Sequence, residues 1–293
     1  MKTLHALDPE LLTALKRLRL GRIADTLPDR FVLADKQDMT FQDLLLLVLT
    51  DEITRREGTA VQRRVDEAGL DTQMRIELFD KTAKIAYDKR LLTELASLRF
   101  VEAHRHVVIL GPVGVGKTFM ASALGHIACR HGYHVRFIRA DEMLTLLRQS
   151  RLDNSRDAEM IALTSVDLLI LDDFALEPMT KEQSRDVYQL FLERTGRASM
   201  IVTSNRDTAE WISMFDDVLL AQSAVDRFKN SAFDFVMDGE SYRPRLKPKL
   251  NPDDPPPNAP APKPQRNPRA SIRSANRVLD SRDGRPTWRR YGR

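Results

Sequence analysis

The chain has 293 residues, 42% of them hydrophobic, which is enough for one large domain or two smaller ones with a buried core. This composition excludes disorder throughout, and a single cysteine, Cys129, excludes an intramolecular disulfide framework and fits a reducing cytoplasm. The net charge of +4 is uneven, because residues 251–293 hold ten Lys or Arg and four Asp, a net charge of +6.

The amino-terminal region predicts neither a signal peptide nor a membrane span. The first residues, MKTLHALDPE, lack the apolar segment of a signal peptide. The longest apolar run, LLLLVL at 44–49, is far shorter than the roughly 20 residues that cross a bilayer. We therefore expect a cytoplasmic protein that does not interact with membranes.

Residues 1–75 form a predicted helical module. Leu11, Leu15 and Leu18 recur at three- and four-residue spacing, and a second such pattern starts at FQDLLLLVL. Several arginines line the module: Arg17, Arg19, Arg22, Arg55, Arg56, Arg63 and Arg64. They indicate either a solvated helix surface or a contact surface for DNA or a protein partner.

Residues 76–250 form the predicted catalytic domain. After the helical sequence KRLLTELASLRFVEAH, short β-rich runs alternate with helical segments: VVIL at 107–110, HVRFI at 134–138, DLLIL at 167–171, SMIVT at 199–203 and FDFVM at 233–237. This alternation predicts an α/β fold, a parallel sheet covered by helices on both faces.

Residues 251–293 form a Pro/Arg-rich tail without apolar periodicity, for which we expect an extended or disordered chain. Its last residues, RPTWRRYGR, combine arginine with Trp288 and Tyr291. Such a segment binds nucleic acid through phosphate contacts and stacking, or serves only to solubilise the protein.

The sequence GPVGVGKT at 111–118 matches the phosphate-binding pattern G-x-x-x-x-G-K-[ST], directly after a strand and before a helix. Its glycines let backbone N–H groups surround phosphate oxygens, while Lys117 reaches the β and γ phosphates and Thr118 ligates Mg²⁺. The predicted ATP-binding residues are Gly111, Pro112, Val113, Gly114, Val115, Gly116, Lys117, Thr118 and Phe119.

Polar residues follow two further predicted strands. DLLIL leads into Asp172 and Asp173, for which we expect Mg²⁺ binding and activation of the attacking water, respectively. The strand SMIVT leads through Ser204 to Asn205, which we expect to position that water or to sense the γ-phosphate.

This order of elements resembles the AAA+ ATPases, and more narrowly the IstB-type transposition helper ATPases, which are related to the helicase loader DnaC. The similarity extends over about residues 10–250 and is carried by LRLGRIADTL, LASLRF, HGYHVRFIRADEML, TSN followed by EW, FDDVLLAQSAVDRF and DGESYRPR. The tail lies outside it.

The resemblance implies an AAA+ core that binds and hydrolyses ATP with Mg²⁺. It also implies a homo-oligomer that assembles on double-stranded DNA without strong sequence preference, remodels it, and stimulates a DDE-type transposase. Arg227 corresponds to the family's arginine finger, which reaches the ATP of a neighbouring subunit, and Arg243 to a sensor-2-like arginine. Arg148, Arg151 and Arg156 belong to the element that faces DNA in this clade.

One position departs from the family pattern, because most AAA+ proteins have Asp-Glu where this chain has Asp172-Asp173. The shorter carboxylate changes the reach to water, so we expect slow hydrolysis. Three alternatives stay open: a DnaC-like helicase loader, an ATP-gated DNA-binding scaffold with little turnover, and a small-molecule kinase.

Overall fold

The computed structural model describes residues 7–80 and 82–246. The tail for which the sequence predicts disorder lies outside the described residues. In the part of the chain that is described, no helix is both long and apolar enough to cross a membrane.

The amino-terminal region is helical, as expected. Its three helices are α1 (Pro9–Arg17), α2 (Ile23–Gln37) and α3 (Phe41–Ala68). The Thr40 side chain caps α3 by accepting a hydrogen bond from the Asp43 backbone N–H, and Gly69 ends the helix in the left-handed conformation.

Helix α3 packs against two different cores. Its first half contributes Val48 to a small cluster with Ile23 and Leu27 of α2. Its last turns contribute Val65 and Ala68 to the core beneath the sheet. Helix α3 therefore begins in the amino-terminal module and ends in the α/β core. Residues that belong to this core thus occur before position 75, where the sequence predicts the boundary between the two parts.

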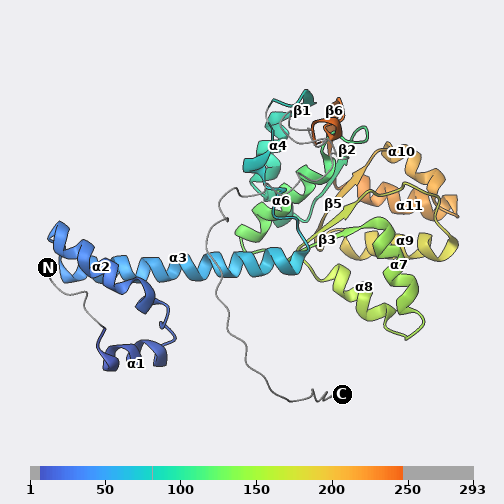
Figure 1. The fold of residues 1–293 in the computed structure, drawn as a ribbon. Coiled ribbons are helices and arrows are strands. Elements are labelled where there is room, and N and C mark those ends of the chain that lie inside the picture. Colours follow the sequence, from blue (N-terminus) through green and yellow to red (C-terminus); the bar gives the residue numbers. More distant parts are fainter. Residues whose placement is uncertain (1–6, 81, 247–293) are drawn as a thin grey trace, which may run out of the picture. The chain divides into compact units, whose positions relative to one another are not determined.

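Six strands form one sheet within the described residues, in the order β1-β6-β2-β5-β4-β3 (Figure 1). The strands are β1 (Ile85–Tyr87), β2 (His106–Leu110), β3 (Val135–Arg139), β4 (Leu168–Asp172), β5 (Ser199–Ser204) and β6 (Ala232–Gly239). All neighbours are parallel except β1 and β6, which are antiparallel. The predicted α/β fold with a mainly parallel sheet is confirmed.

Successive strand residues enter opposite cores. In β2, Val108 faces one cluster and Val107 and Ile109 face the other. The helices that cover the sheet or connect its strands are α4 (Lys89–Ala96), α5 (Arg99–Glu102), α6 (Lys117–Arg130), α7 (Ala140–Ser150), α8 (Arg156–Thr164), α9 (Lys181–Arg194), α10 (Thr208–Trp211) and α11 (Val218–Lys229). Both faces are covered, which explains why the strands are apolar runs rather than alternating ones.

The pairing of β1 with β6 is a feature that the sequence analysis missed. The register places Ile85 opposite Gly239 and Tyr87 opposite Met237. A strand of three residues gives no periodic signal. This pairing brings the chain near residue 80 next to the segment that follows β6.

Candidate nucleotide-binding site

The predicted site residues follow the carboxyl ends of three parallel strands. The phosphate-binding loop follows β2, Asp172 is the last residue of β4 and Asn205 directly follows β5. Because β2, β5 and β4 lie next to one another in that order in the sheet, these residues meet at one edge.

Two glycines of the loop are required by close contact with β6 and with the segment that follows it. At Gly111 (φ +153°) an added Cβ would lie 2.1 Å from the Met237 carbonyl oxygen. At Gly114 (φ +87°) it would lie 2.2 Å from the Ser241 hydroxyl oxygen. Any larger residue would displace backbone or side-chain atoms that hold the loop.

The Lys117 side chain folds back over the loop. Its ammonium group donates hydrogen bonds of 2.8 Å to the Gly111 carbonyl and 2.9 Å to the Pro112 carbonyl. Burial lowers the pKa of Lys117, while the charges of Asp173 and Asp172 act in the opposite direction. The ammonium group thus lies inside the loop and close to both acids.

Asp172 is buried and accepts two hydrogen bonds. Its Oδ2 accepts from the Thr118 hydroxyl at 3.0 Å and its Oδ1 from the Thr203 hydroxyl at 2.6 Å. Burial raises the pKa of Asp172, and the hydrogen bond from Thr203 opposes that shift. The two residues expected to hold Mg²⁺, Thr118 and Asp172, are therefore in direct contact.

Asp173 begins the turn after β4 in the left-handed conformation, with φ 54°. Its backbone N–H donates to the Thr203 hydroxyl at 2.9 Å. Its side chain is half-buried and interacts electrostatically with Lys117. A short polar residue such as aspartate tolerates this conformation better than most.

Thr203 is the residue at the end of β5 that contacts the acids, because it bonds to both Asp172 and Asp173. Asn205 is exposed and lies one residue beyond the strand, and its expected role in positioning the attacking water or sensing the γ-phosphate stays a prediction. A residue that bridges two acids on another strand leaves no signal in sequence spacing.

A small apolar pocket of about 80 Å³ lies beside the loop. Val115, Gly116 and Phe119 are among the residues that line it. The other residues that line it come from distant parts of the sequence: Leu78, Phe79, Asp80, Ala83, Ile85 and Tyr242. The Phe79 and Phe119 ring centroids are 5.6 Å apart.

The two arginines suggested by the family resemblance lie in different places. Arg243 is exposed in a 3-10 turn, Arg243–Leu246, close enough to Lys117 for its charge to lower the pKa of that lysine. Arg227 is exposed in the last turn of α11, beside the buried Phe228. No described residue forms an ion pair with its guanidinium group.

The three arginines expected to contact DNA also differ from one another. Arg148 is exposed near the end of α7. Arg151 and Arg156 instead bind the buried carboxylate of Asp186 in α9, at 2.7 Å and 2.8 Å. Because both form this intramolecular ion pair, the expectation of a phosphate contact is revised and now rests on Arg148.

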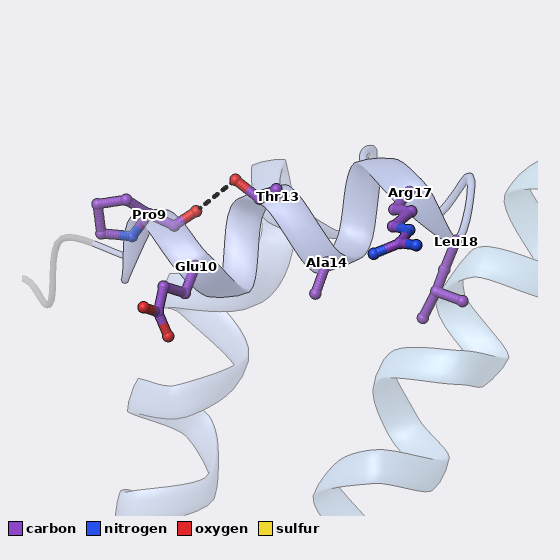
Figure 2. A pocket seen from close by; sticks show the side chains of 6 residues that line it. All are labelled: Pro9, Glu10, Thr13, Ala14, Arg17 and Leu18. Atoms are coloured by element: carbon purple, nitrogen blue, oxygen red, sulfur yellow. Dashed lines mark hydrogen bonds between the residues drawn. The ribbon is translucent and has the colours of Figure 1, made fainter.

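A wider pocket, of about 440 Å³, lies on α1 (Figure 2). Figure 2 shows Glu10, Ala14 and Arg17 pointing to the same side of this helix. Its wall contains no residue of the phosphate-binding loop and no pair of neighbouring acids. We assign it no part in nucleotide binding.

A glycine-rich loop with an internal lysine, followed by a helix and joined to a buried aspartate two strands away in the sheet, defines a P-loop nucleotide-binding protein. The family of IstB-like ATP binding proteins matches residues 13–250. The chain belongs to this family.

Curated relatives agree with that membership. The chain is 39% identical over 240 residues to an insertion-sequence ATP-binding protein of Mycobacterium tuberculosis, covering 81% of this chain and 95% of the relative. It is 32% identical over 238 residues to the IS21 putative ATP-binding protein of Pseudomonas aeruginosa, covering 81% and 90%.

Solved structures are more distant. DnaI is 18% identical over 56% of this chain and 90% of its own, with a TM-score of 0.49. The DnaC helicase loader is 20% identical over 50% and 86%, with a TM-score of 0.44.

Proposed function

We propose that the protein is the ATP-hydrolysing helper of an insertion sequence, which assembles on DNA and stimulates a partner transposase. The observation that carries this proposal is the contact between Thr118 of the phosphate-binding loop and Asp172 of β4. This contact supports the proposal because a hydroxyl, a carboxylate and the nearby Lys117 ammonium together suit a nucleoside triphosphate and its metal.

Mg²⁺ fits this arrangement. Thr118 and Asp172 supply two hard oxygen ligands, the chemistry this ion prefers. Residues 7–80 and 82–246 contain no cluster of three or more His, Cys, Asp or Glu that could hold a metal, so phosphate oxygens would complete its coordination. When bound, the ion neutralises charge that develops on the transferred phosphoryl group.

The apolar pocket beside Gly116 is the candidate site for the adenine base. It adjoins the loop, and Phe79, Phe119 and Tyr242 offer aromatic surface for a flat base. Lys117 would exchange the Gly111 and Pro112 carbonyls for phosphate oxygens, which are stronger acceptors because they are charged.

Hydrolysis requires a base for the attacking water, and Asp173 is the candidate. Its half-buried side chain lies near Lys117, where a γ-phosphate would sit. The carboxylate is one methylene shorter than the glutamate of most AAA+ proteins, so we propose slow turnover, with ATP acting largely as an assembly switch.

Assembly would complete the site. Arg227 is exposed on α11 and has no ion-pair partner among the described residues, which suits an arginine that reaches a neighbouring subunit's ATP. Arg148 is the candidate for a phosphate contact with double-stranded DNA, a contact that positions the protein without reading sequence.

A DnaC-like helicase loader is the second candidate, since its ATP chemistry would be the same. The amino-terminal helices would then bind a helicase instead of a transposase. A gene for a DDE-type transposase next to this one would favour the first candidate. Assays with the purified protein and either the transposase or the helicase would then decide between the two candidates.

The test combines nucleotide binding with transposition. The wild-type protein should bind a fluorescent ATP analogue, and Lys117→Ala should weaken binding by ~10- to 100-fold, because a charge-assisted contact is lost. Lys181→Ala, an exposed lysine at the start of α9, is the matched control and should bind normally. The wild type, but not Lys117→Ala, should stimulate strand transfer by the partner transposase. Strand transfer that is independent of this protein would refute the helper role.

A further inference from the structure

The segment after β6 is held on two sides. Its Tyr242 backbone N–H donates to the Gly114 carbonyl of the phosphate-binding loop at 2.8 Å. On the other side, Arg245 forms an ion pair with Asp80 at 3.1 Å, although the two residues are 165 positions apart. The segment therefore spans from the loop to the chain that precedes β1.

Asp80 is the centre of the second attachment. Its Oδ1 accepts hydrogen bonds from the Thr82 backbone N–H at 2.8 Å and from the Thr82 hydroxyl at 2.6 Å. Its carboxylate also interacts electrostatically with the Tyr242 side chain and pairs with Arg245. These contacts lower the pKa of Asp80 to about 2, with the Thr82 side chain contributing most, so the carboxylate is ionised.

Arg245 reinforces the same attachment. It donates to the Thr82 hydroxyl at 3.2 Å, and its guanidinium carbon lies 5.7 Å from the centroid of the Tyr242 ring. A cation at this distance from an aromatic ring is attracted by the ring's π electrons. The guanidinium group thus contacts all three residues of the cluster.

Two parts of the candidate ATP site depend on this attachment. Tyr242 lines the apolar pocket, and Arg243, the next residue, lies near Lys117. Neither Asp80 nor Arg245 belongs to the phosphate-binding loop or to the acids of β4 and its following turn.

We infer that Asp80 is a positioning residue for ATP binding, which holds Tyr242 against the base and Arg243 toward the phosphates through its contacts with Tyr242 and Arg245. This inference rests on the proposed ATP site. Asp80 also lines the apolar pocket, and the role inferred for it is to hold the segment after β6 in place. This attachment therefore needs both the carboxylate of Asp80 and the guanidinium group of Arg245.

The test uses Asp80→Asn in the full-length protein, which removes the negative charge at nearly constant size. Asp51→Asn is the matched control, because Asp51 is 30% exposed against 29% for Asp80 and pairs with Arg30 at 2.6 Å in the amino-terminal module. Asp80→Asn should weaken binding of the fluorescent ATP analogue by about three- to tenfold, whereas Asp51→Asn should change it less than about twofold. Equal dissociation constants for Asp80→Asn and the wild type would overturn the inference.

A double-variant cycle tests whether Asp80 affects ATP binding through the position of Arg243. The loss of affinity in Asp80→Asn/Arg243→Ala should be smaller than the product of the two single losses, because Arg243 needs the attachment to be in place. Fully multiplicative losses would contradict the positioning role. Thermal unfolding midpoints should agree among the variants, which excludes a general loss of stability.

Hydrogen exchange without nucleotide separates this inference from the proposed function. The amides of residues 239–246, including the Tyr242 N–H, should exchange faster in Asp80→Asn than in the wild type or Asp51→Asn. Unchanged exchange would refute the attachment even if ATP binds. Faster exchange in a protein whose wild type binds no ATP would refute the proposed function and leave the attachment in place.

Discussion

The Thr118 hydroxyl donates a 3.0 Å hydrogen bond to Oδ2 of Asp172, a residue 54 positions further along the chain. Thr118 lies in the first turn of α6, at the end of the phosphate-binding loop, and Asp172 is the last residue of β4. Their contact joins the nucleotide-binding loop to the residues expected to support hydrolysis, and the first predictions concern that contact.

Asp172→Ala should abolish Mg²⁺-dependent ATP hydrolysis, because it removes the carboxylate that bonds to Thr118 and Thr203. Phosphate release measured against Mg²⁺ concentration checks this. Binding of ATP without Mg²⁺ should change much less, since Lys117 stays in place. Hydrolysis that persists at the wild-type rate would exclude Asp172 from the metal site.

Asp173→Glu should keep the fold and raise turnover, because the longer side chain restores the reach found in most AAA+ proteins. Steady-state phosphate release, with and without DNA, is the measurement. A fall of about tenfold or more would show instead that the left-handed turn at Asp173, φ 54°, is adapted to aspartate.

Arg148→Ala should lower the slope of log K against log salt for DNA binding by about one unit, since one phosphate contact is lost. Arg151→Ala should leave that slope nearly unchanged and lower the free energy of unfolding by about 1–3 kcal/mol, because the buried Asp186 loses a partner. Fluorescence anisotropy at several salt concentrations and urea unfolding provide the two readouts. A lower salt slope for Arg151→Ala together with an unchanged slope for Arg148→Ala would place the DNA surface at Arg151.

Arg227→Ala should bind ATP, but its rate of ATP hydrolysis should be about a thousandfold lower than that of the wild type if the arginine acts as a finger. Lys117→Ala should bind ATP ~10- to 100-fold more weakly, so at an ATP concentration well below its dissociation constant its own sites stay largely empty. Mixing the two variants with DNA pairs an intact loop with an intact Arg227 at some subunit interfaces, so part of the activity should return. Mixtures that co-assemble yet stay inactive would assign Arg227 a role within its own subunit.

His106 should make the protein less stable in mild acid. Burial, together with the charges of Arg194 and Arg105, lowers the pKa of this histidine from its ordinary 6.5 to about 4. Between these values the unfolded chain binds a proton that the folded chain excludes, so stability present above pH 6.5 is lost as the pH falls. At pH 5 the loss is about 2 kcal/mol.

Urea unfolding at pH 7 and pH 5 measures the His106 contribution. His106→Leu should show a smaller difference between the two values than the wild type, whatever its absolute stability. The exposed His131 is the control position, and His131→Leu should retain the wild-type difference. Equal pH dependence in all three proteins would refute the assignment.

The sequence predicted those parts of the site that lie on regular elements. The apolar runs before Gly111 and Asp172 identify two buried strands, and strands that run parallel bring their following residues to one edge. The hydrogen bond between Thr118 and Asp172 follows from that geometry. The alternation of strands and helices fixed the fold class for the same reason.

The remaining features depend on contacts that no local pattern records. The charge of Arg151 is visible in the sequence, but its buried partner Asp186 lies 35 residues away on another helix. The apolar pocket combines Phe79, Phe119 and Tyr242 from three separate segments. Such groupings are decided by packing, which periodicity and spacing do not report.

Helix α3 determines where the chain can be truncated without loss of contacts in the α/β core. Arg64, in its last third, donates a 2.8 Å hydrogen bond to the carbonyl of Cys129 near the end of α6. A truncation that starts at residue 76 would remove this contact together with Val65 and Ala68 from the core. A shortened protein meant to keep the nucleotide site intact must therefore begin upstream of residue 61, where α3 starts to pack against that core.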